Sequence, residues 1–152
     1  MLEKMSDFFE NRLEGYDEHM RTNLIGAEEF YPFTAKQLPV VAGASILDLG
    51  CGTGLELEEY DRLCPSAKIT GIDLSQGMLS ALRKKFMNKD ITLIVGSYFD
   101  VPFGERIYDA AISVESLHHF TKEEKNTLIC KVTYCIKKEW IFCLDGLLCS
   151  FR

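Results

Sequence analysis

The sequence lacks a long hydrophobic run: none of its apolar stretches approaches the roughly 20 residues that a membrane-spanning helix needs. Residues 1–4 also lack the pattern that begins a secretory signal peptide. Both absences argue against a secreted or membrane-bound protein. We therefore expect a cytoplasmic protein that has no membrane among its partners.

Basic residues are scarce and hardly cluster. Lys and Arg number 17 against 23 Asp and Glu, which gives a formal net charge of −6. The single basic run, at 83–85, is short and typical of a solvated helix face. Because nucleic-acid binding rests on clusters of Lys and Arg, the composition argues against a nucleic acid as the main partner.

The six cysteines include no Cys-x-x-Cys pair. Disulfide frameworks are typical of small secreted chains, and several of these cysteines stand among apolar residues, where a reduced thiol acts as a small hydrophobe. We expect free thiols and no zinc site. The adjacent His118 and His119 do not change this, because neighbouring side chains point in different directions and no third ligand has suitable spacing.

What the chain contains suits one compact α/β domain. Its 152 residues are 47% hydrophobic and 26% charged. Strand-like and helix-like segments alternate, which predicts a three-layer, doubly wound fold with a mostly parallel sheet. The predicted strands are 45–49, 68–72, 91–95, 108–114 and 140–144, and the predicted helices between them are 54–64, 75–87 and one that Thr121 caps.

Two helical regions precede the first predicted strand. Apolar residues recur at three- and four-residue steps over 1–20, which predicts an amphipathic helix broken near Gly15. Residues 22–39 form the second region, and Pro32 predicts a break within it. On periodicity alone, the apolar stripe of the first helix simply packs on the rest of the domain.

Residues 46–54 carry the most specific signal in the chain. They read Ile-Leu-Asp-Leu-Gly-Cys-Gly-Thr-Gly, an apolar run that continues through three alternate glycines into a helix-like segment. Strand, glycine turn and helix begin a βαβ unit. Glycine permits the backbone angles of such a reversal and lets a ligand lie against the bare backbone, where the first amides of the helix point at it.

The acidic residues around this turn indicate which ligand it takes. The dinucleotide fingerprint needs a third glycine where this chain has Leu55. Asp48 would attract an ammonium group but would gain nothing beside a diphosphate. Asp73 lies about 20 residues past the turn, where a doubly wound fold places the acceptor of ribose hydroxyl groups; its alternative role, capping the next helix, suits Ser75 equally well. The pattern favours a nucleoside that carries positive charge.

The segment Asp48-Leu49-Gly50-Cys51-Gly52-Thr53-Gly54 resembles the first motif of class I S-adenosylmethionine-dependent methyltransferases, and the similarity extends to about Asp145. The resemblance implies a Rossmann-like core, residues 41–152, under an N-terminal helical lid, residues 1–40. It also implies in-line transfer of a methyl group from S-adenosylmethionine. We expect a small-molecule acceptor, because nothing basic suggests a nucleic acid.

The resemblance also implies roles for individual residues. The glycine turn would contact the methionine part through its backbone, Asp48 would favour the ammonium, Asp73 would hold the ribose, and the residues that leave the fourth strand would line the floor under the methyl group. Ser97 is a departure, because many members have an acidic residue there that accepts from the adenine amino group. The implied cofactor-binding residues are Asp48, Gly50, Cys51, Gly52, Gly54, Asp73, Leu74, Met78, Ser97, Tyr98, Val114 and Glu115.

The motif does not name a general base. If residues 1–40 form a lid, Tyr16 and His19 lie near the pocket. His118 or His119 could take a proton or orient a substrate, and a capping or packing role is the alternative for both. Tyr16, His118 and His119 are therefore the catalytic candidates.

The C-terminal end departs from the family pattern. Sheets of this family normally have seven strands, whereas five are predicted here, and residues 146–152 are too few for the last two. An unpaired strand at 140–144 would be an exposed edge, so we expect either a homo-oligomer through that strand or a shortened chain. Two rival functions stay open: a non-catalytic remnant that binds S-adenosylmethionine or S-adenosylhomocysteine, and an NAD-dependent oxidoreductase, which Leu55 disfavours.

Overall fold

The centre of the molecule is a six-stranded sheet in the order β3-β2-β1-β4-β5-β6. The first five strands run parallel, and β6 is antiparallel to β5. The computed structural model describes residues 5–137, 140–144 and 147–151. The strands are β1 Ser45–Leu49, β2 Lys68–Asp73, β3 Ile91–Val95, β4 Ala110–Ser113, β5 Trp140–Leu144 and β6 Leu147–Phe151.

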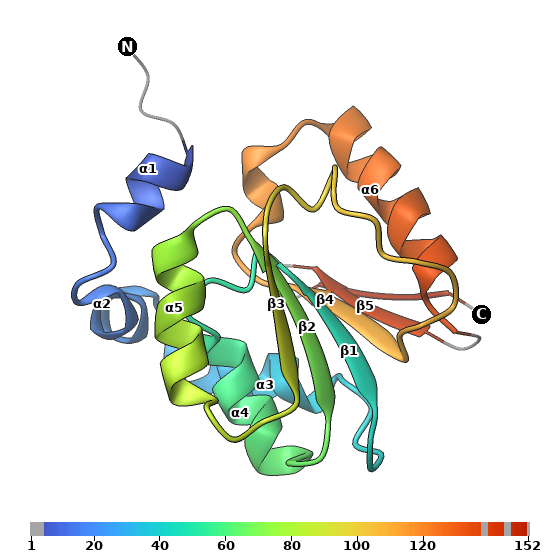
Figure 1. Cartoon of the computed structure of the whole chain (residues 1–152), viewed down its shortest axis with the longest axis horizontal. Helices are drawn as coiled ribbons and strands as arrows, with labels where there is room; N and C mark the ends of the chain where they lie inside the picture. Colours follow the sequence, from blue (N-terminus) through green and yellow to red (C-terminus); the bar gives the residue numbers. More distant parts are fainter. Residues whose placement is uncertain (1–4, 138–139, 145–146, 152) are drawn as a thin grey trace.

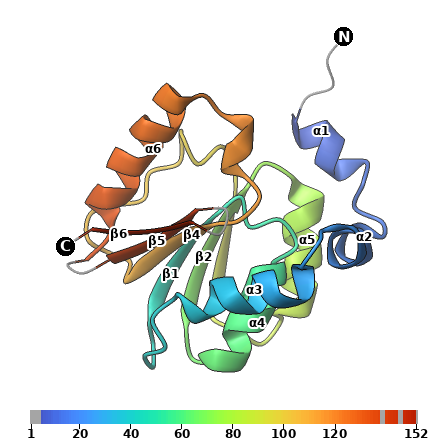
Figure 2. The same cartoon turned by 180° about the vertical axis from the view of Figure 1, so that it is seen from behind.

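Helices cover both faces of this sheet (Figures 1 and 2). The helices α3, α4 and α5 lie on one face, α6 lies on the other, and α1 and α2 lie beside α5, outside the layer of α3 and α4. This three-layer arrangement confirms the predicted Rossmann-like fold. The helices are α1 Met5–Glu10, α2 Tyr16–Asn23, α3 Ala27–Lys36, α4 Leu55–Leu63, α5 Gln76–Lys85 and α6 Lys122–Cys135, with a short 3-10 helix at Leu117–His119.

The central strand β1 explains why both faces need a helical layer. Its side chains alternate between two apolar clusters: Ile46 packs with residues of α3 and α4, while Leu47 and Leu49 pack with residues of α6. All three are fully buried. A strand buried on both faces has no regular alternation of polar and apolar residues, so the mostly apolar run of the sequence, with Asp48 as its one acidic residue, was the correct signal.

Capping residues place the helix starts as predicted. The hydroxyl of Ser75 accepts a hydrogen bond from the Met78 amide at 3.1 Å and so begins α5. Thr121 and Glu124 form a capping box at α6: the Glu124 amide donates to the Thr121 hydroxyl, and the Glu124 carboxylate accepts from the Thr121 amide. The predicted interruption at Gly15 is also present, since this glycine, at φ 72°, separates α1 from α2. Residues 1–4 of that predicted helix lie outside the described residues.

The predicted break at Pro32 is wrong. The helix α3 continues through Pro32, and the break falls instead at Gly26, which precedes α3 with a φ of 81°. A proline inside a helix removes one hydrogen bond, but the following turn is anchored by the fully buried Thr34 and Ala35. Packing therefore outweighs the local cost of proline.

The prediction of five strands with an unpaired fifth is also wrong. The segment Leu147–Phe151 forms a sixth strand, and Leu144 pairs with Leu147 at one end of an antiparallel ladder that reaches from Trp140 to Phe151 at the other. The strand β5 therefore has a neighbour on each side, β4 and β6. The expected homo-oligomer through an exposed fifth strand loses its physical basis.

Candidate functional site

The strand order reverses beside β1, because β2 and β3 lie on one side of it and β4 and β5 on the other. Ligands of open α/β sheets bind at such a switch point, outside the carboxyl ends of the strands. Two segments leave the sheet there. The glycine turn, residues 50–54, follows β1, and the loop 114–116 follows β4.

The glycine turn is held by the end of β2. The amides of Gly50 and Cys51 both donate to the carbonyl of Ile72, at 2.8 and 3.2 Å. The amide of Gly52 donates to Oδ2 of Asp73 at 2.9 Å. These three amides are therefore engaged within the fold, so they are not available to the oxygens of a phosphate.

Gly50 is also where the turn meets the loop after β4. Its φ is 76°, and a Cβ at this position would lie 2.7 Å from Cβ of Ser116, a separation too short for two carbons. The hydroxyl of Ser116 lies 2.9 Å from the hydroxyl of Tyr98. The glycine thus lets the segments after β1, β3 and β4 approach one another at a single point.

Asp73 is a structural member of this site as well as a candidate ribose ligand. Its Oδ2 accepts from Gly52, as above, and its Oδ1 accepts from the Ser75 amide at 2.9 Å. Ser75, not Asp73, supplies the helix cap. Asp73 therefore fixes both the glycine turn and the start of α5.

Asp48 and Glu56 form a buried carboxyl pair beneath the turn. Asp48 is fully buried and Glu56 is 5% exposed. No donor among the described residues reaches either oxygen of Asp48, and its carboxyl lies against that of Glu56. Burial, and then the charge of Glu56, raise the pKa of Asp48 well above its usual range. Burial likewise raises the pKa of Glu56.

Two tyrosines close the space above this pair. Tyr16 begins α2 and Tyr31 lies in α3, and both line the pocket at the glycine turn. Burial, followed by the charge of Glu56, raises the pKa of Tyr16 to about 12 and raises that of Tyr31 further. Both phenols therefore stay protonated at neutral pH and act as hydrogen-bond donors rather than bases.

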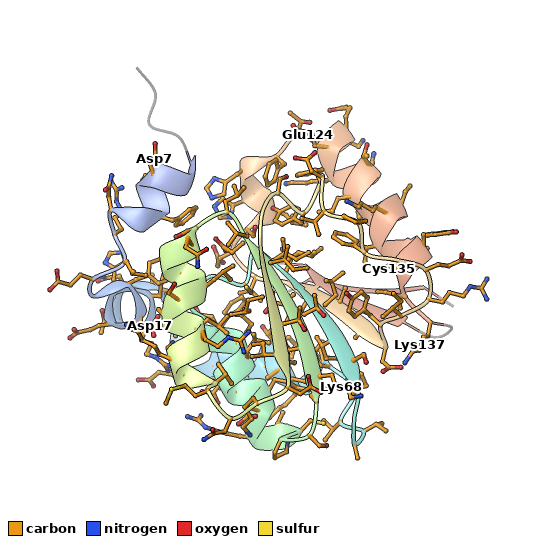
Figure 3. The ribbon with its side chains drawn as sticks, in the orientation of Figure 1. Asp7, Asp17, Lys68, Glu124, Cys135 and Lys137 are labelled. Carbon is orange, nitrogen blue, oxygen red and sulfur yellow. The ribbon has the colours of Figure 1, made fainter. Side chains whose placement is uncertain are left out.

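Charged side chains fasten α2 to the core. Asp17, labelled in Figure 3, accepts a hydrogen bond from the Thr53 hydroxyl and pairs with Lys85 of α5. Lys85 also contacts Glu58 at 2.5 Å, and Glu58 contacts Arg21 of α2 at 2.7 Å. The basic run 83–85 is therefore not only a solvated face, as the sequence suggested, because Lys85 joins α2 to α4 and α5.

A cavity of about 760 Å³ lies between the N-terminal helices and the loop after β4. It adjoins a smaller pocket of about 30 Å³ at the glycine turn, and the two share Tyr16, Met20 and Glu115. The smaller volume holds about one water molecule. The larger cavity is lined by Phe8, Phe9, Asn11, Arg12, Glu14, Gly15, Tyr16, His19, Met20, Glu115, His118 and His119.

The three catalytic candidates all line this larger cavity, but the histidines lie at its exposed side. The rings of His118 and His119 are 3.9 Å apart between centroids, and the His119 ring meets that of Phe9 at 6.4 Å. Nδ1 of His118 lies 3.9 Å from Oε2 of Glu115. Within the described part of the chain, no group of three His, Cys, Asp or Glu residues is placed to hold a metal ion.

The segment proposed to face adenine is held by α6. Nζ of Lys131 donates to the carbonyls of Tyr98, Phe99 and Val101 at 3.0, 2.8 and 2.6 Å, so all three donors of its ammonium have partners. The hydroxyl of Ser97 accepts from the Phe99 amide at 3.2 Å. Ser97 therefore helps to shape its own loop.

The sequence-predicted cofactor residues fall into two groups in space. Leu74 is 38% exposed, whereas Met78 is 1% exposed and belongs to the apolar core. Cys51 is also buried, with its thiol against Gly71, so its backbone is the part open to a ligand. The residues that line the pocket at the glycine turn are Gly50, Cys51, Gly52, Gly54, Val114 and Glu115; those that do not are Asp48, Asp73, Leu74, Met78, Ser97 and Tyr98.

Sequence reasoning missed four residues of this site: Glu56, Thr53, Tyr31 and Ser116. Glu56 offered a signal, because it is an acidic residue on the apolar side of a helix, between Leu55 and Leu57. The sequence around Thr53, Tyr31 and Ser116 contained no such signal. Their roles come from contacts with α2, with the carboxyl pair and with Gly50, which join segments far apart in the chain.

The fold is a doubly wound domain, and its candidate site is the turn after β1. Residues 46–139 match the protein family described as "Methyltransferase domain". The chain belongs to this family, and within it to the class I S-adenosylmethionine-dependent methyltransferases. In the described residues, no helix has both the length and the apolar character that crossing a membrane requires.

Individual relatives agree with this assignment. An uncharacterized methyltransferase of Geobacillus sp. (strain WCH70) is 28% identical over 91% of this chain and 62% of its own length. Demethylmenaquinone methyltransferase of Symbiobacterium thermophilum is 33% identical over 68% of this chain and 43% of its own length. A putative S-adenosyl-L-methionine-dependent methyltransferase from Methanococcus maripaludis shares the fold with a TM-score of 0.72 at 18% identity, over 96% of this chain and 68% of that structure. The chain thus spans less than two thirds of the curated relatives' length.

Proposed function

We propose that this protein binds S-adenosylmethionine at the glycine turn and transfers its methyl group to a small molecule held in the adjoining cavity. The observation that carries the proposal is the common wall of the two spaces, which is formed by Tyr16, Met20 and Glu115. A cofactor on one side of this wall and an acceptor on the other would bring the methyl group and its acceptor within reach. The volume of about 760 Å³ lies in the range of small-molecule sites.

The residues of the glycine turn would bind the cofactor. Asp73 would accept from the ribose hydroxyl groups, and the carbonyls of the turn with Asp48 would favour the ammonium group. Leu74, Met78, Ser97 and the backbone of Tyr98 would surround the adenine, as the resemblance implies. S-adenosylmethionine supplies an activated methyl group, so the main task of this chain is to orient the two reactants, which can contribute several kcal/mol.

The helices α1 and α2 would act as a lid, with residues 1–40 as one unit over the core 41–152. Tyr16 lies between cavity and turn as a neutral phenol, since its pKa is raised to about 12 by burial and by nearby carboxylates. It would donate a hydrogen bond and help to exclude water. His118 and His119, at the exposed side, would meet the acceptor rather than the cofactor.

A binding function without turnover is the second candidate. Two observations favour it: the Ser97 hydroxyl is already used by the Phe99 amide, and the described site offers no buried base beside the larger cavity. In either case we expect a cytoplasmic protein, since Cys51, Cys64, Cys130 and Cys135 are free thiols.

The test is transfer of an isotope-labelled methyl group from S-adenosylmethionine into fractions of small metabolites, followed by mass spectrometry. We expect label in a small molecule. The variant His119→Ala should raise the KM of that acceptor without changing cofactor affinity, because His119 lines only the larger cavity. Label found solely in RNA or protein would contradict the proposed acceptor class, and tight cofactor binding without any transfer would favour the second candidate.

A further inference from the structure

The carboxyl pair of Asp48 and Glu56 is a feature that the glycine motif does not explain. Two carboxylates buried side by side repel one another and lose their hydration. A hydrogen bond between two carboxyl groups requires a proton on one of them. Because no other donor among the described residues reaches Asp48, a shared proton is the arrangement that satisfies both groups.

The side chains around the pair supply little positive charge to it. Lys85 is the cation that acts on Glu56, and its ammonium already contacts Asp17 and Glu58. Glu56 also lines the pocket at the glycine turn, so a ligand in that pocket reaches Glu56 directly and Asp48, which is fully buried, through it. The titratable groups that face the pair from the neighbouring elements are Asp73 of β2, Cys51 of the turn, Tyr16 of α2, Tyr31 of α3 and Lys85 of α5.

We propose that Glu56 completes the cofactor site: with Asp48 it binds the ammonium group of the methionine part, and the pair gives up its shared proton to solvent as the ammonium arrives. This inference rests on the proposed function. The net charge of the site does not change, because the ammonium brings one positive charge and the departing proton removes one. Tyr16 and Tyr31 line the same pocket as Glu56 and stay protonated, so they add no negative charge beside the pair.

The proposal has a definite pH dependence. The proton that must leave opposes binding at low pH, so cofactor affinity rises with pH while the pair in the free protein is still protonated. The slope approaches tenfold per pH unit for one released proton. Below about pH 7 the ammonium of the ligand itself stays charged and does not add to the slope.

The experiment is calorimetric titration of the whole chain with S-adenosylhomocysteine, which carries the same ammonium group. Titrations in two buffers with different ionisation enthalpies, between about pH 5 and pH 7, count the protons released. We expect release that approaches one proton. Glu56→Gln, which keeps the shape and the hydrogen bond without the proton, should abolish the release and weaken binding roughly tenfold or more. Glu59→Gln is the matched control on the same helix, since Glu59 pairs with Arg62 instead.

The outcomes separate this inference from the proposed function. If the wild type binds and its binding enthalpy does not depend on the buffer, the pair releases no proton and the inference is wrong, although the cofactor site stands. Binding by Glu56→Gln equal to that of the wild type also overturns it. If the folded wild type binds neither S-adenosylhomocysteine nor S-adenosylmethionine, the proposed function itself fails.

Discussion

At the scale of single residues, the candidate site contains groups whose burial lowers the stability of the fold. Asp48 and Glu56 are buried together without a cation of their own, and such groups are retained at functional sites at a cost to the fold. The backbone of Gly50 is a second unfavourable feature of this kind. It adopts a conformation that side chains disfavour, at the one point where Ser116 leaves no room for a Cβ.

Glu56→Gln is expected to stabilise the protein at neutral pH. The folded-state pKa values of the pair are raised, so the pair favours folding at low pH and this contribution is lost as the pH rises through those values. Removing one carboxyl should therefore increase the free energy of unfolding by about 1 kcal/mol near pH 7 and flatten its pH dependence. Urea unfolding of the wild type and the variant at several pH values checks this. A variant that is less stable at every pH would contradict the account.

A comparison of Gly50→Ala with Gly52→Ala separates the cost of a positive φ from the cost of a steric clash between the new Cβ and Ser116. Both glycines have positive φ, 76° and 49°, but only Gly50 has a neighbour within reach of a Cβ. Gly52→Ala should cost about 1 kcal/mol, the usual penalty for a left-handed residue, while Gly50→Ala should cost clearly more. Adding Ser116→Gly should restore part of the lost stability to Gly50→Ala but not to Gly52→Ala. Thermal unfolding of the two single and the two double variants measures this. Equal losses of stability at the two glycines would show that Ser116 is not the obstacle.

At the scale of elements, the helix α2 lies at the glycine turn, where Tyr16 and Met20 help to line the pocket. It is held by Asp17, which contacts Thr53 and Lys85, and by Arg21, which contacts Glu58. Exposed ion pairs are each worth less than about 1 kcal/mol, so this attachment is weak enough to open. The pocket that α2 helps to line measures about 30 Å³, so we expect α2 to move when a nucleoside binds there.

Asp17→Ala is therefore expected to speed cofactor association. Loss of its two contacts lowers the cost of opening by about 1 kcal/mol, which corresponds to roughly fivefold in rate. Stopped-flow mixing with S-adenosylmethionine measures the rate, and Glu18→Ala, an exposed acid on the same helix, controls for the change in charge. If both variants associate at the wild-type rate, α2 does not limit entry.

The helix α6 acts on the site through Lys131. Its three hydrogen bonds fix the carbonyls of Tyr98, Phe99 and Val101, and bonds to a charged group are worth about 2 kcal/mol. Lys131→Met should speed hydrogen exchange in residues 97–103 and weaken cofactor binding, while β1 and β2 keep their protection. Lys122→Met, in the exposed first turn of α6, should change neither. Unchanged exchange in the loop of Lys131→Met would show that this lysine does not hold it.

How far the sequence predicts these elements depends on whether the signal is local. The run 45–49, the cap Thr121 and the glycine turn were all correctly placed because propensity, burial pattern and turn chemistry agree there. Pro32 misled because tertiary packing of α3 overrides a local rule. The strand Leu147–Phe151 was missed because its pairing with β5, rather than its short sequence, defines it.

At the scale of the whole molecule, the sheet gathers four separate segments at one edge. The turn after β1, the end of β2, the loop after β3 and the loop after β4 meet around Gly50, Asp73, Tyr98 and Ser116. The first two segments were predictable, since motif and spacing place them at the carboxyl ends of adjacent strands. The family resemblance already placed Tyr16 of α2 near the pocket, but the contribution of α3 was not predictable, because no local pattern links Tyr31 to the glycine turn.

The central claim is that S-adenosylmethionine binds at this edge of the sheet. The most direct test is a titration of the ¹⁵N-labelled protein with S-adenosylhomocysteine, followed by amide NMR shifts. We predict saturable shifts that concentrate in residues 48–56, 73–78, 97–98 and 114–116, with loss of binding in Asp73→Ala. Shifts confined to other surfaces, or none in a folded protein, would contradict the account.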